Sequence, residues 1–232
     1  MTDITYEQRR SQIETYFDRT ASAAWAKLTS DAPVGRVRAS VRAGRDEMRA
    51  TLLSWLPDDL SGKRILDAGC GTGAFAVEAA RRGADVVAID LSPTLVALAR
   101  DRLPAELASR IEFCSGDMLD PALGTFDHVV AMDSVIHYKT EDAVNALAQL
   151  SHRTRRSILF TFAPRTPLLA AMITVGRLFP RGDRAPWLEP MAEGRIARLM
   201  ANHDALQSWQ TQRTRRVSSG FYKSQAMEWL RP

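Results

Sequence analysis

The sequence predicts an α/β fold with a doubly wound, mostly parallel sheet. From Lys63 onward, apolar runs of strand length alternate with segments of helical periodicity, a pattern typical of βαβ units. The stretch ILDAGCGTG, at residues 65–73, joins the first apolar run to the first helical segment through three closely spaced glycines. A chain of 232 residues is long enough to bury one large core. We therefore expect one sheet domain with an appended segment.

Hydrophobic periodicity assigns the elements in chain order. The expected strands lie near 63–68, 85–90, 111–115, 126–132 and 157–163, and an antiparallel pair near 206–217 and 219–230 closes the sheet. The expected helices lie near 73–82, 93–102, 140–152 and 193–203. Seven strands in this order predict a Rossmann-like sheet that helices cover on both faces.

Two segments lie outside this alternation. Residues 6–17 and 36–56 read as amphipathic helices, and we expect residues 1–56 to form an N-terminal helical cap on a sheet domain of residues 57–232. One face of the second helix carries Val37, Val41, Met48, Leu52 and Leu56. An apolar helix bracketed by prolines is expected within 164–190, as part of an insertion near 164–203 on the substrate side.

Composition limits the classes of function. Two cysteines, Cys70 and Cys114, support neither a disulfide framework nor a zinc site, and we expect no bound metal. We expect a cytoplasmic protein, because no apolar run is long enough for a membrane span and the first residues lack an apolar signal segment. Residues 151–232 carry 14 basic and 5 acidic side chains, which favours an anionic partner such as a small acid, a lipid headgroup or a nucleic acid.

The glycine turn predicts a nucleotide-type ligand with a positive charge. Ligands of open parallel sheets bind at the carboxyl ends of the strands, where glycines allow close approach to the backbone. The spacing Gly69-x-Gly71-x-Gly73 differs from the usual dinucleotide turn, and Asp67 before it would repel a pyrophosphate. Asp90, which ends the second strand, is placed to accept hydrogen bonds from two ribose hydroxyls. A cationic nucleoside fits this arrangement best.

These motifs resemble those of the class I S-adenosylmethionine-dependent methyltransferases. The resemblance rests on ILDAGCGTG, on the acid at Asp90, on SGDM at 115–118 and on FDHVVAMDSVIHY at 126–138. It implies that Asp67, Gly69, Gly71 and Gly73 surround the methionine part of the cofactor, that Asp90 and Leu91 hold the ribose, that Asp117 and Met118 contact the adenine, and that Met132 lies under the cofactor. Asp133 is expected to be a turn residue or a helix cap and not a metal ligand.

Longer stretches resemble the magnesium-protoporphyrin IX O-methyltransferase family of bacteriochlorophyll biosynthesis. They are YFDRTASAAWAKLTSD, VRAGRDEM, LLSWLP, DSVIHY and ILFTFAPRTPLL, and they extend over most of the chain. The resemblance implies methyl transfer from S-adenosylmethionine to one propionate of the magnesium porphyrin, with magnesium present only in the substrate. It also implies that a magnesium chelatase subunit delivers the substrate, and peripheral membrane contact through 164–185 would suit that role.

Acceptor-side residues follow from position. His137, just beyond the fourth strand, is the candidate catalytic residue, either orienting the acceptor carboxylate or removing a residual proton. Tyr16 and Tyr138 are candidates for a lid or a wall of the substrate site, and Arg165 is a candidate cation for an anionic substrate. Thr29 stands where related sequences often carry a tyrosine, which argues against a catalytic tyrosine here.

Three alternative functions remain open at this stage. The cofactor motifs do not encode the acceptor, so another small acceptor such as a quinone precursor is compatible with them. A nucleic-acid methyltransferase would suit the basic last third, but no Asn-Pro-Pro-Tyr-like element follows the fourth strand, and we expect no nucleic-acid partner. A cofactor-binding module without catalysis, in which His137 is structural, is the third alternative.

Overall fold

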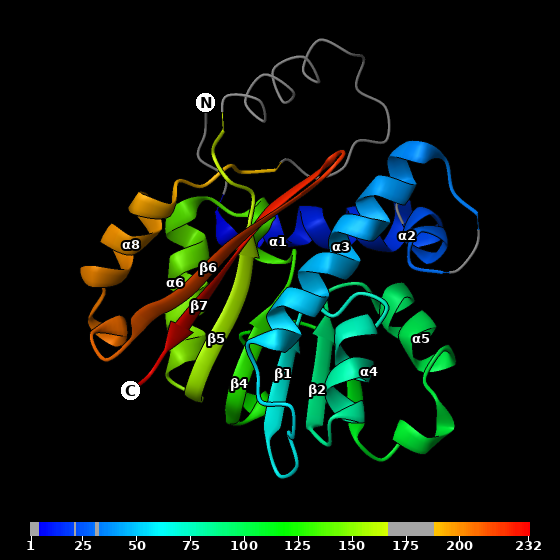
Figure 1. Cartoon of the computed structure of the whole chain (residues 1–232), viewed down its shortest axis with the longest axis horizontal. Helices are drawn as coiled ribbons and strands as arrows, with labels where there is room; N and C mark the ends of the chain where they lie inside the picture. Colours follow the sequence, from blue (N-terminus) through cyan, green and yellow to red (C-terminus); the bar gives the residue numbers. More distant parts are fainter. Residues whose placement is uncertain (1–4, 21, 31–32, 167–187) are drawn as a thin grey trace.

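The centre of the structure is a seven-stranded sheet (Figure 1). The computed structural model describes residues 5–20, 22–30, 33–166 and 188–232. The strands are β1 Arg64–Ala68, β2 Asp85–Asp90, β3 Ile111–Ser115, β4 Phe126–Ala131, β5 Thr154–Phe162, β6 Gln210–Ser219 and β7 Tyr222–Leu230. Their order is β3-β2-β1-β4-β5-β7-β6, parallel up to β5, and β7 pairs antiparallel with both β5 and β6. The predicted fold class is confirmed.

Helices cover the two faces of this sheet and build a core on each (Figure 1). They are α1 Tyr6–Thr15, the π-helix η1 Tyr16–Thr20, α2 Ser22–Leu28, α3 Arg36–Ser54, α4 Ala74–Arg81, α5 Pro93–Asp101, α6 Thr140–Ser151 and α8 Glu193–Ala201. Buried residues of α3, α4 and α5 share one core, and those of α6 and α8 share the other with the opposite faces of the same strands. Short 3-10 turns are Ala105–Leu107, Pro121–Leu123, Val135–His137 and Asp204–Leu206.

Local sequence explains why the central elements form where they do. All six residues of β4 are buried, as expected of a strand covered on both faces, and its acid Asp127 accepts a hydrogen bond from the Arg64 amide at 2.9 Å. The hydroxyl of Ser92 caps α5 by accepting from the Leu95 amide at 3.2 Å, with Pro93 at the first helical position. The first bond joins the starts of β1 and β4, and the Ser92 cap fixes the first residues after β2 beside the sheet edge.

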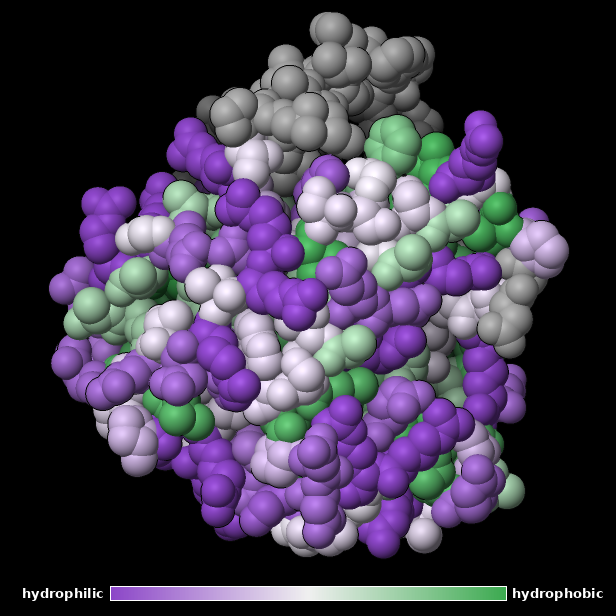
Figure 2. Space-filling view, in the orientation of Figure 1, coloured by the Kyte–Doolittle hydropathy of each residue, from purple (hydrophilic) through white to green (hydrophobic). Residues whose placement is uncertain are grey.

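Helix α3 packs closely against the sheet at a glycine. A side chain at Gly44 would meet the ring of Tyr222 on β7 at 2.5 Å, so this contact depends on the missing Cβ atom. Met48, Leu52 and Leu56 are buried below this point, as the periodicity predicts, whereas Val37 is 51% exposed. Figure 2 shows that hydrophilic side chains cover most of the visible face, on which the first turns of α3 lie.

The predicted elements differ from the observed ones in a few places. Helix α2 and the π-helix were not predicted, and the last hairpin turns at Gly220 instead of near residue 218. The apolar helix expected within 164–190 falls mostly on 167–187, outside the described residues. The division at residue 56 stays a prediction. In the part of the chain that the structure describes, no helix has the length and apolar character needed to cross a membrane.

Candidate active site

A cavity of about 340 Å³ opens at the carboxyl ends of the parallel strands. It lies where the strand order reverses between β1 and β4, the position at which open α/β sheets bind their ligands. Residues of β1, β2 and β4 and of the loops that follow them form its floor, and residues of α1, the π-helix and α3 form the opposite wall. The N-terminal helices are therefore part of the site.

The three glycines of the turn have different roles. The backbone at Gly69 has a φ of +87°, and a Cβ atom there would meet Ser134 at 2.4 Å. Gly73, with a φ of +78°, begins α4 and packs so closely on the Phe113 ring that a Cβ atom would lie 2.8 Å from it. Gly71, with a φ of +53°, has no atom within 4 Å of its Cβ position and lines the cavity. Only Gly71 leaves open space for a ligand above the turn.

Asp90 fixes this turn to the end of β2. Its Oδ2 atom accepts a hydrogen bond from the Gly71 amide at 2.8 Å, and its Oδ1 atom accepts from the Ser92 amide at 2.9 Å. Burial raises the pKa of the Asp90 carboxyl, and these backbone hydrogen bonds oppose the rise. Each oxygen keeps a second lone pair, so the carboxylate can still accept from a diol in the cavity.

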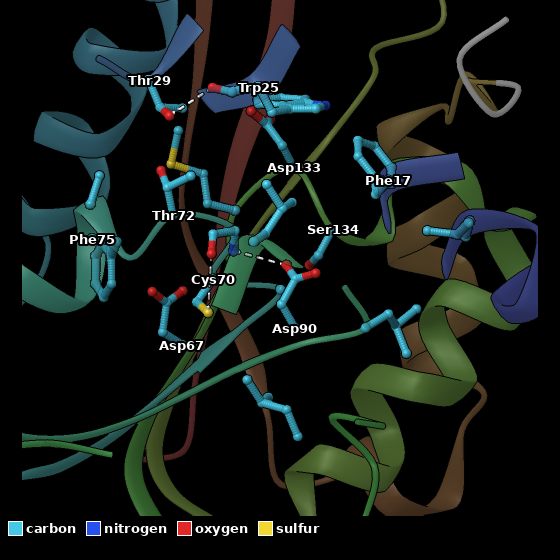
Figure 3. A pocket seen from close by; sticks show the side chains of 18 of the residues that line it. Phe17, Trp25, Thr29, Asp67, Cys70, Thr72, Phe75, Asp90, Asp133 and Ser134 are labelled. Atoms are coloured by element: carbon cyan, nitrogen blue, oxygen red, sulfur yellow. Dashed lines mark hydrogen bonds between the residues drawn. The ribbon is translucent and has the colours of Figure 1, made fainter. Parts of the chain in front are cut away.

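Asp67 carries a carboxyl oxygen without a partner. The residue is 2% exposed, and its Oδ2 atom has no hydrogen-bond partner among the described residues. The pKa of Asp67 is raised to about 7, because burial and then the charge of Asp90 raise it by more than the Ala76 amide and Arg45 lower it. In Figure 3 the carboxylates of Asp67 and Asp90 flank the glycine turn. A buried acid of this kind favours a ligand that brings a positive charge.

The adenine side expected from the sequence also lines the cavity. Asp117 and Met118 follow β3, and the Oδ1 atom of Asp117 accepts from the Leu119 amide at 2.9 Å. The other oxygen of Asp117 pairs with the guanidinium of Arg10 on α1. One helical turn earlier, the ring of Tyr6 stacks on Tyr138 with 4.9 Å between centroids. Helix α1 is thus held against this side of the cavity by an ion pair and an aromatic stack.

The π-helix joins the wall of the cavity to the segment that follows β2. The carboxylate of Asp18 accepts from the Ser92 hydroxyl and from the Thr94 amide, both at 3.1 Å, and these bonds lower the pKa of Asp18. The ring of Phe17 lies 5.7 Å from the rings of both Trp25 and His137. His137 is 5% exposed and lines the cavity from the 3-10 turn after β4. An aromatic wall therefore faces the site next to His137.

The structure brings most of the predicted residues together. The cavity is lined by Asp67, Gly69, Gly71, Asp90, Leu91, Asp117, Met118, Met132, His137 and Tyr138. Gly73, Tyr16 and Arg165 are not among its lining residues. Gly73 serves helix packing instead, the Tyr16 ring contacts Phe17, and the side chain of Arg165 is exposed. Their assignment to ligand binding gains no support from this geometry.

Several lining residues were not predicted as site residues. They include Tyr6, Arg10, Phe17, Trp25 and Arg45, all from the N-terminal helices. Phe17 and Trp25 lie within the family-like stretch YFDRTASAAWAKLTSD, and Arg45 lies within VRAGRDEM, so these stretches were the sequence signal for this wall. Among the described residues no group of three or more histidine, cysteine or acidic side chains could hold a metal ion.

Comparison with known proteins agrees with the fold and the cavity. Residues 65–157 match the family described as methyltransferase domain, and residues 131–231 match the family described as magnesium-protoporphyrin IX methyltransferase C-terminus. The sheet order, the glycine turn and the acid-lined cavity therefore define a class I S-adenosylmethionine-dependent methyltransferase.

The relatives define the family more narrowly. Magnesium-protoporphyrin O-methyltransferase of Rhodobacter capsulatus is 51% identical over 225 residues, which is 97% of each chain. The chain belongs to the magnesium-protoporphyrin O-methyltransferase family. The crystal structure of magnesium protoporphyrin IX methyltransferase from Synechocystis PCC 6803 with bound SAH superposes with a TM-score of 0.84 at 27% identity, covering 96% of this chain and 100% of that chain. Ubiquinone biosynthesis O-methyltransferase of Xanthomonas oryzae is 38% identical over 133 residues, which is 53% of this chain and 55% of that one.

Proposed function

We propose that this protein transfers the methyl group of S-adenosylmethionine to a propionate carboxylate of magnesium protoporphyrin IX. The products are the monomethyl ester and S-adenosylhomocysteine. The observation that carries the proposal is the 51% identity over 97% of the chain with an enzyme named for this reaction. The quinone-pathway relative supports the alternative acceptor less well, because its similarity stops at about half of the chain.

The cavity suits this cofactor at each of its parts. The free lone pairs of Asp90 would accept from the ribose hydroxyls, and the open backbone at Gly71 leaves room for the ligand beside them. Asp67 would stabilise the positively charged end of the cofactor, since its Oδ2 atom has no protein partner among the described residues. Asp117, Met118 and Met132 line the cavity and would surround the adenine base.

The chemistry requires positioning more than proton removal. A propionate has a reference pKa near that of a glutamate, about 4.3, so it is ionised at neutral pH. A lone pair of its oxygen forms the new bond to the methyl carbon while the carbon–sulfur bond breaks and its electrons stay on sulfur. The protein must therefore hold the oxygen in line with that bond and exclude water. The half-buried aromatic wall of Phe17 and Trp25 supports the exclusion of water from this side of the site.

His137 would hold the acceptor carboxylate. It is buried, lines the cavity on the β4 side and packs against Phe17. A hydrogen bond from its ring to a carboxylate oxygen would orient the nucleophile without removing a proton. Tyr138 lines the same side, and burial raises the pKa of its hydroxyl to about 12, so it stays protonated.

Delivery of the porphyrin is a further part of the proposal. We expect a cytoplasmic protein that receives its substrate from a magnesium chelatase subunit, with peripheral membrane contact through residues 164–185. The basic last third of the chain supports contact with an anionic surface. Co-sedimentation with the chelatase subunit and with anionic vesicles, each against a buffer control, would test the two contacts separately.

Turnover of labelled S-adenosylmethionine tests the function itself. We expect label in an ester product when magnesium protoporphyrin IX is the acceptor, and none with RNA or with a quinol. Label in the quinol would favour the quinone-pathway alternative. Cofactor binding by calorimetry without label in any acceptor would favour a binding module.

A further inference from the structure

Arg45 of α3 is held rigidly at the edge of the cavity. Its Nη1 atom donates to the Oδ2 atom of Asp133 at 2.6 Å, and its guanidinium lies over the Trp25 ring, 4.6 Å from the centroid. The side chain is 23% exposed and lines the cavity. A guanidinium has five N–H donors, and Asp133 is the acceptor that Arg45 contacts among the described residues. Its remaining donors are open to what the cavity holds.

Asp133 is itself fixed from several sides. Its backbone has a φ of +56°, in the left-handed region that non-glycine residues rarely adopt. Its Oδ1 atom accepts from the Tyr222 hydroxyl at 3.0 Å and from the Thr161 hydroxyl at 3.1 Å, and the Thr161 hydroxyl accepts from its amide at 2.8 Å. Two further strands, β5 and β7, therefore hold the carboxylate that orients Arg45. Figure 3 shows the Asp133 side chain directed toward Trp25.

Both acids and arginines line the cavity near Arg45. Asp67 and Asp90 lie beside the glycine turn, and Arg45 is close enough to Asp67 to lower the pKa of that carboxyl. Arg42 and Arg49 of α3 also line the cavity, but Arg42 donates to the carbonyls of Lys27 and Leu28, and Arg49 pairs with Asp46. An anion beside the two acids would need a cation fixed close to them, and Arg45 is the arginine whose charge reaches Asp67. A preoriented guanidinium is suited to bind a carboxylate, because its N–H groups match the two oxygens. Its fixed rotamer also lowers the entropy lost on binding.

We propose that Arg45, oriented by Asp133 and Trp25, binds a carboxylate of the reactants in this cavity. The inference rests on the proposed function, which supplies two sources of that chemistry, the methionine carboxylate of the cofactor and a propionate of the porphyrin. Arg45 is a binding residue, and Asp133 acts through it as a positioning residue. This proposed role is separate from the roles of the glycine turn and of His137 in the site.

Direct binding measurements with Arg45→Gln test the proposal without requiring turnover. Each source is represented by a pair of ligands that differ in the carboxylate. S-adenosylmethionine is compared with its decarboxylated form, and magnesium protoporphyrin IX is compared with its dimethyl ester. Arg38→Gln is the matched control, because Arg38 lies on the same helix, is exposed and does not line the cavity. Asp133→Asn keeps a residue that tolerates the left-handed backbone while removing the charge.

The expected result is selective for one carboxylate. Arg45→Gln should weaken one carboxylate-bearing ligand by about 10- to 150-fold, as expected for hydrogen bonds to a charged group, and its carboxylate-free counterpart by less than about 2-fold. Asp133→Asn should weaken the same ligand by a smaller factor. Equal losses within both ligand pairs, or losses no larger than those of Arg38→Gln, would overturn the proposal. Absence of methyl transfer in the unaltered protein would contradict the proposed function. The binding comparison would still test the role of Arg45, because it does not depend on turnover.

Discussion

Replacement of Asp90 by alanine should separate ligand binding from general stability. The change removes a carboxylate that accepts from the Gly71 amide at 2.8 Å and from the Ser92 amide at 2.9 Å, and with it the acceptor for a ribose diol. A hydrogen bond to a charged acceptor contributes about 1.5–3 kcal/mol. Loss of one such bond to the ligand therefore predicts an affinity lower by about 10- to 150-fold. Loss of both would give more.

Calorimetric titration with S-adenosylhomocysteine measures this affinity directly. Asp85→Ala is the matched control, because Asp85 begins the same strand, has a side chain that is 63% exposed and pairs with Arg110 at 3.4 Å, away from the cavity. Thermal unfolding of both variants shows how much of the loss of affinity comes from a less stable fold. An unchanged dissociation constant in a folded Asp90→Ala protein would refute the assignment of the ribose to this residue.

Three further experiments test other parts of the structure. Gly71→Ala should weaken S-adenosylhomocysteine binding in calorimetry more than Gly62→Ala does, because both residues have positive φ and open Cβ positions but only Gly71 lines the cavity. His137→Gln should retain more single-turnover ester formation between pH 6 and 9 than His137→Ala, since misplacing the nucleophile by about 1 Å costs about 100-fold. Burial lowers the pKa of His128 to about 4. The unfolded state therefore binds a proton that the folded state does not, and unfolding free energy should fall as pH drops from about 6.5 toward 4, by about 2 kcal/mol between pH 7 and 5 in urea titrations.

Each of these tests has a contrary outcome. Equal affinity losses for the two glycine variants would show that backbone strain from the added Cβ atom, and not its contact with the ligand, weakens binding in Gly71→Ala. The two His137 variants could instead be equally inactive, and the rate of the unaltered protein could rise as a group loses its proton near neutrality. That pair of results would favour His137 as a general base. A His128→Gln protein with the same pH dependence of stability as the unaltered protein would remove His128 from the acid response.

The sheet could be predicted because its signals are local. Strands β1 to β5 follow from apolar runs and intervening helical periodicity, and the glycine turn marks the end of the first one. Helix α2 was missed because its seven residues, SAAWAKL, are too few to show a period. The last hairpin was misplaced by about two residues, although Gly220 with a φ of +51° marks the turn.

The floor of the site could be predicted, but its wall could not. Asp67, Gly71 and Asp90 belong to short motifs whose spacing indicates a position at the sheet edge. The contacts between Arg10 and Asp117 and between Arg45 and Asp133 join residues 107 and 88 positions apart, and no local pattern encodes them. Val37 was predicted on the apolar face of α3, but it is exposed. Periodicity identifies that face of the helix but does not show how far along the helix the sheet covers it.

If Asp67 binds the positively charged end of the cofactor, its unpartnered oxygen makes proton exchange part of ligand binding. The pKa of Asp67 is raised to about 7, so protonated and ionised forms of the empty site coexist near neutrality. A bound cation favours the ionised carboxylate and lowers that pKa, so binding should release a fraction of a proton per site. The measured heat then includes the ionisation enthalpy of the buffer, and titrations in phosphate and in Tris should differ in enthalpy at pH 7 in the unaltered protein but not in Asp67→Asn. We therefore expect uptake of the methyl donor to depend on the surrounding pH, with tighter binding as the pH rises through neutrality.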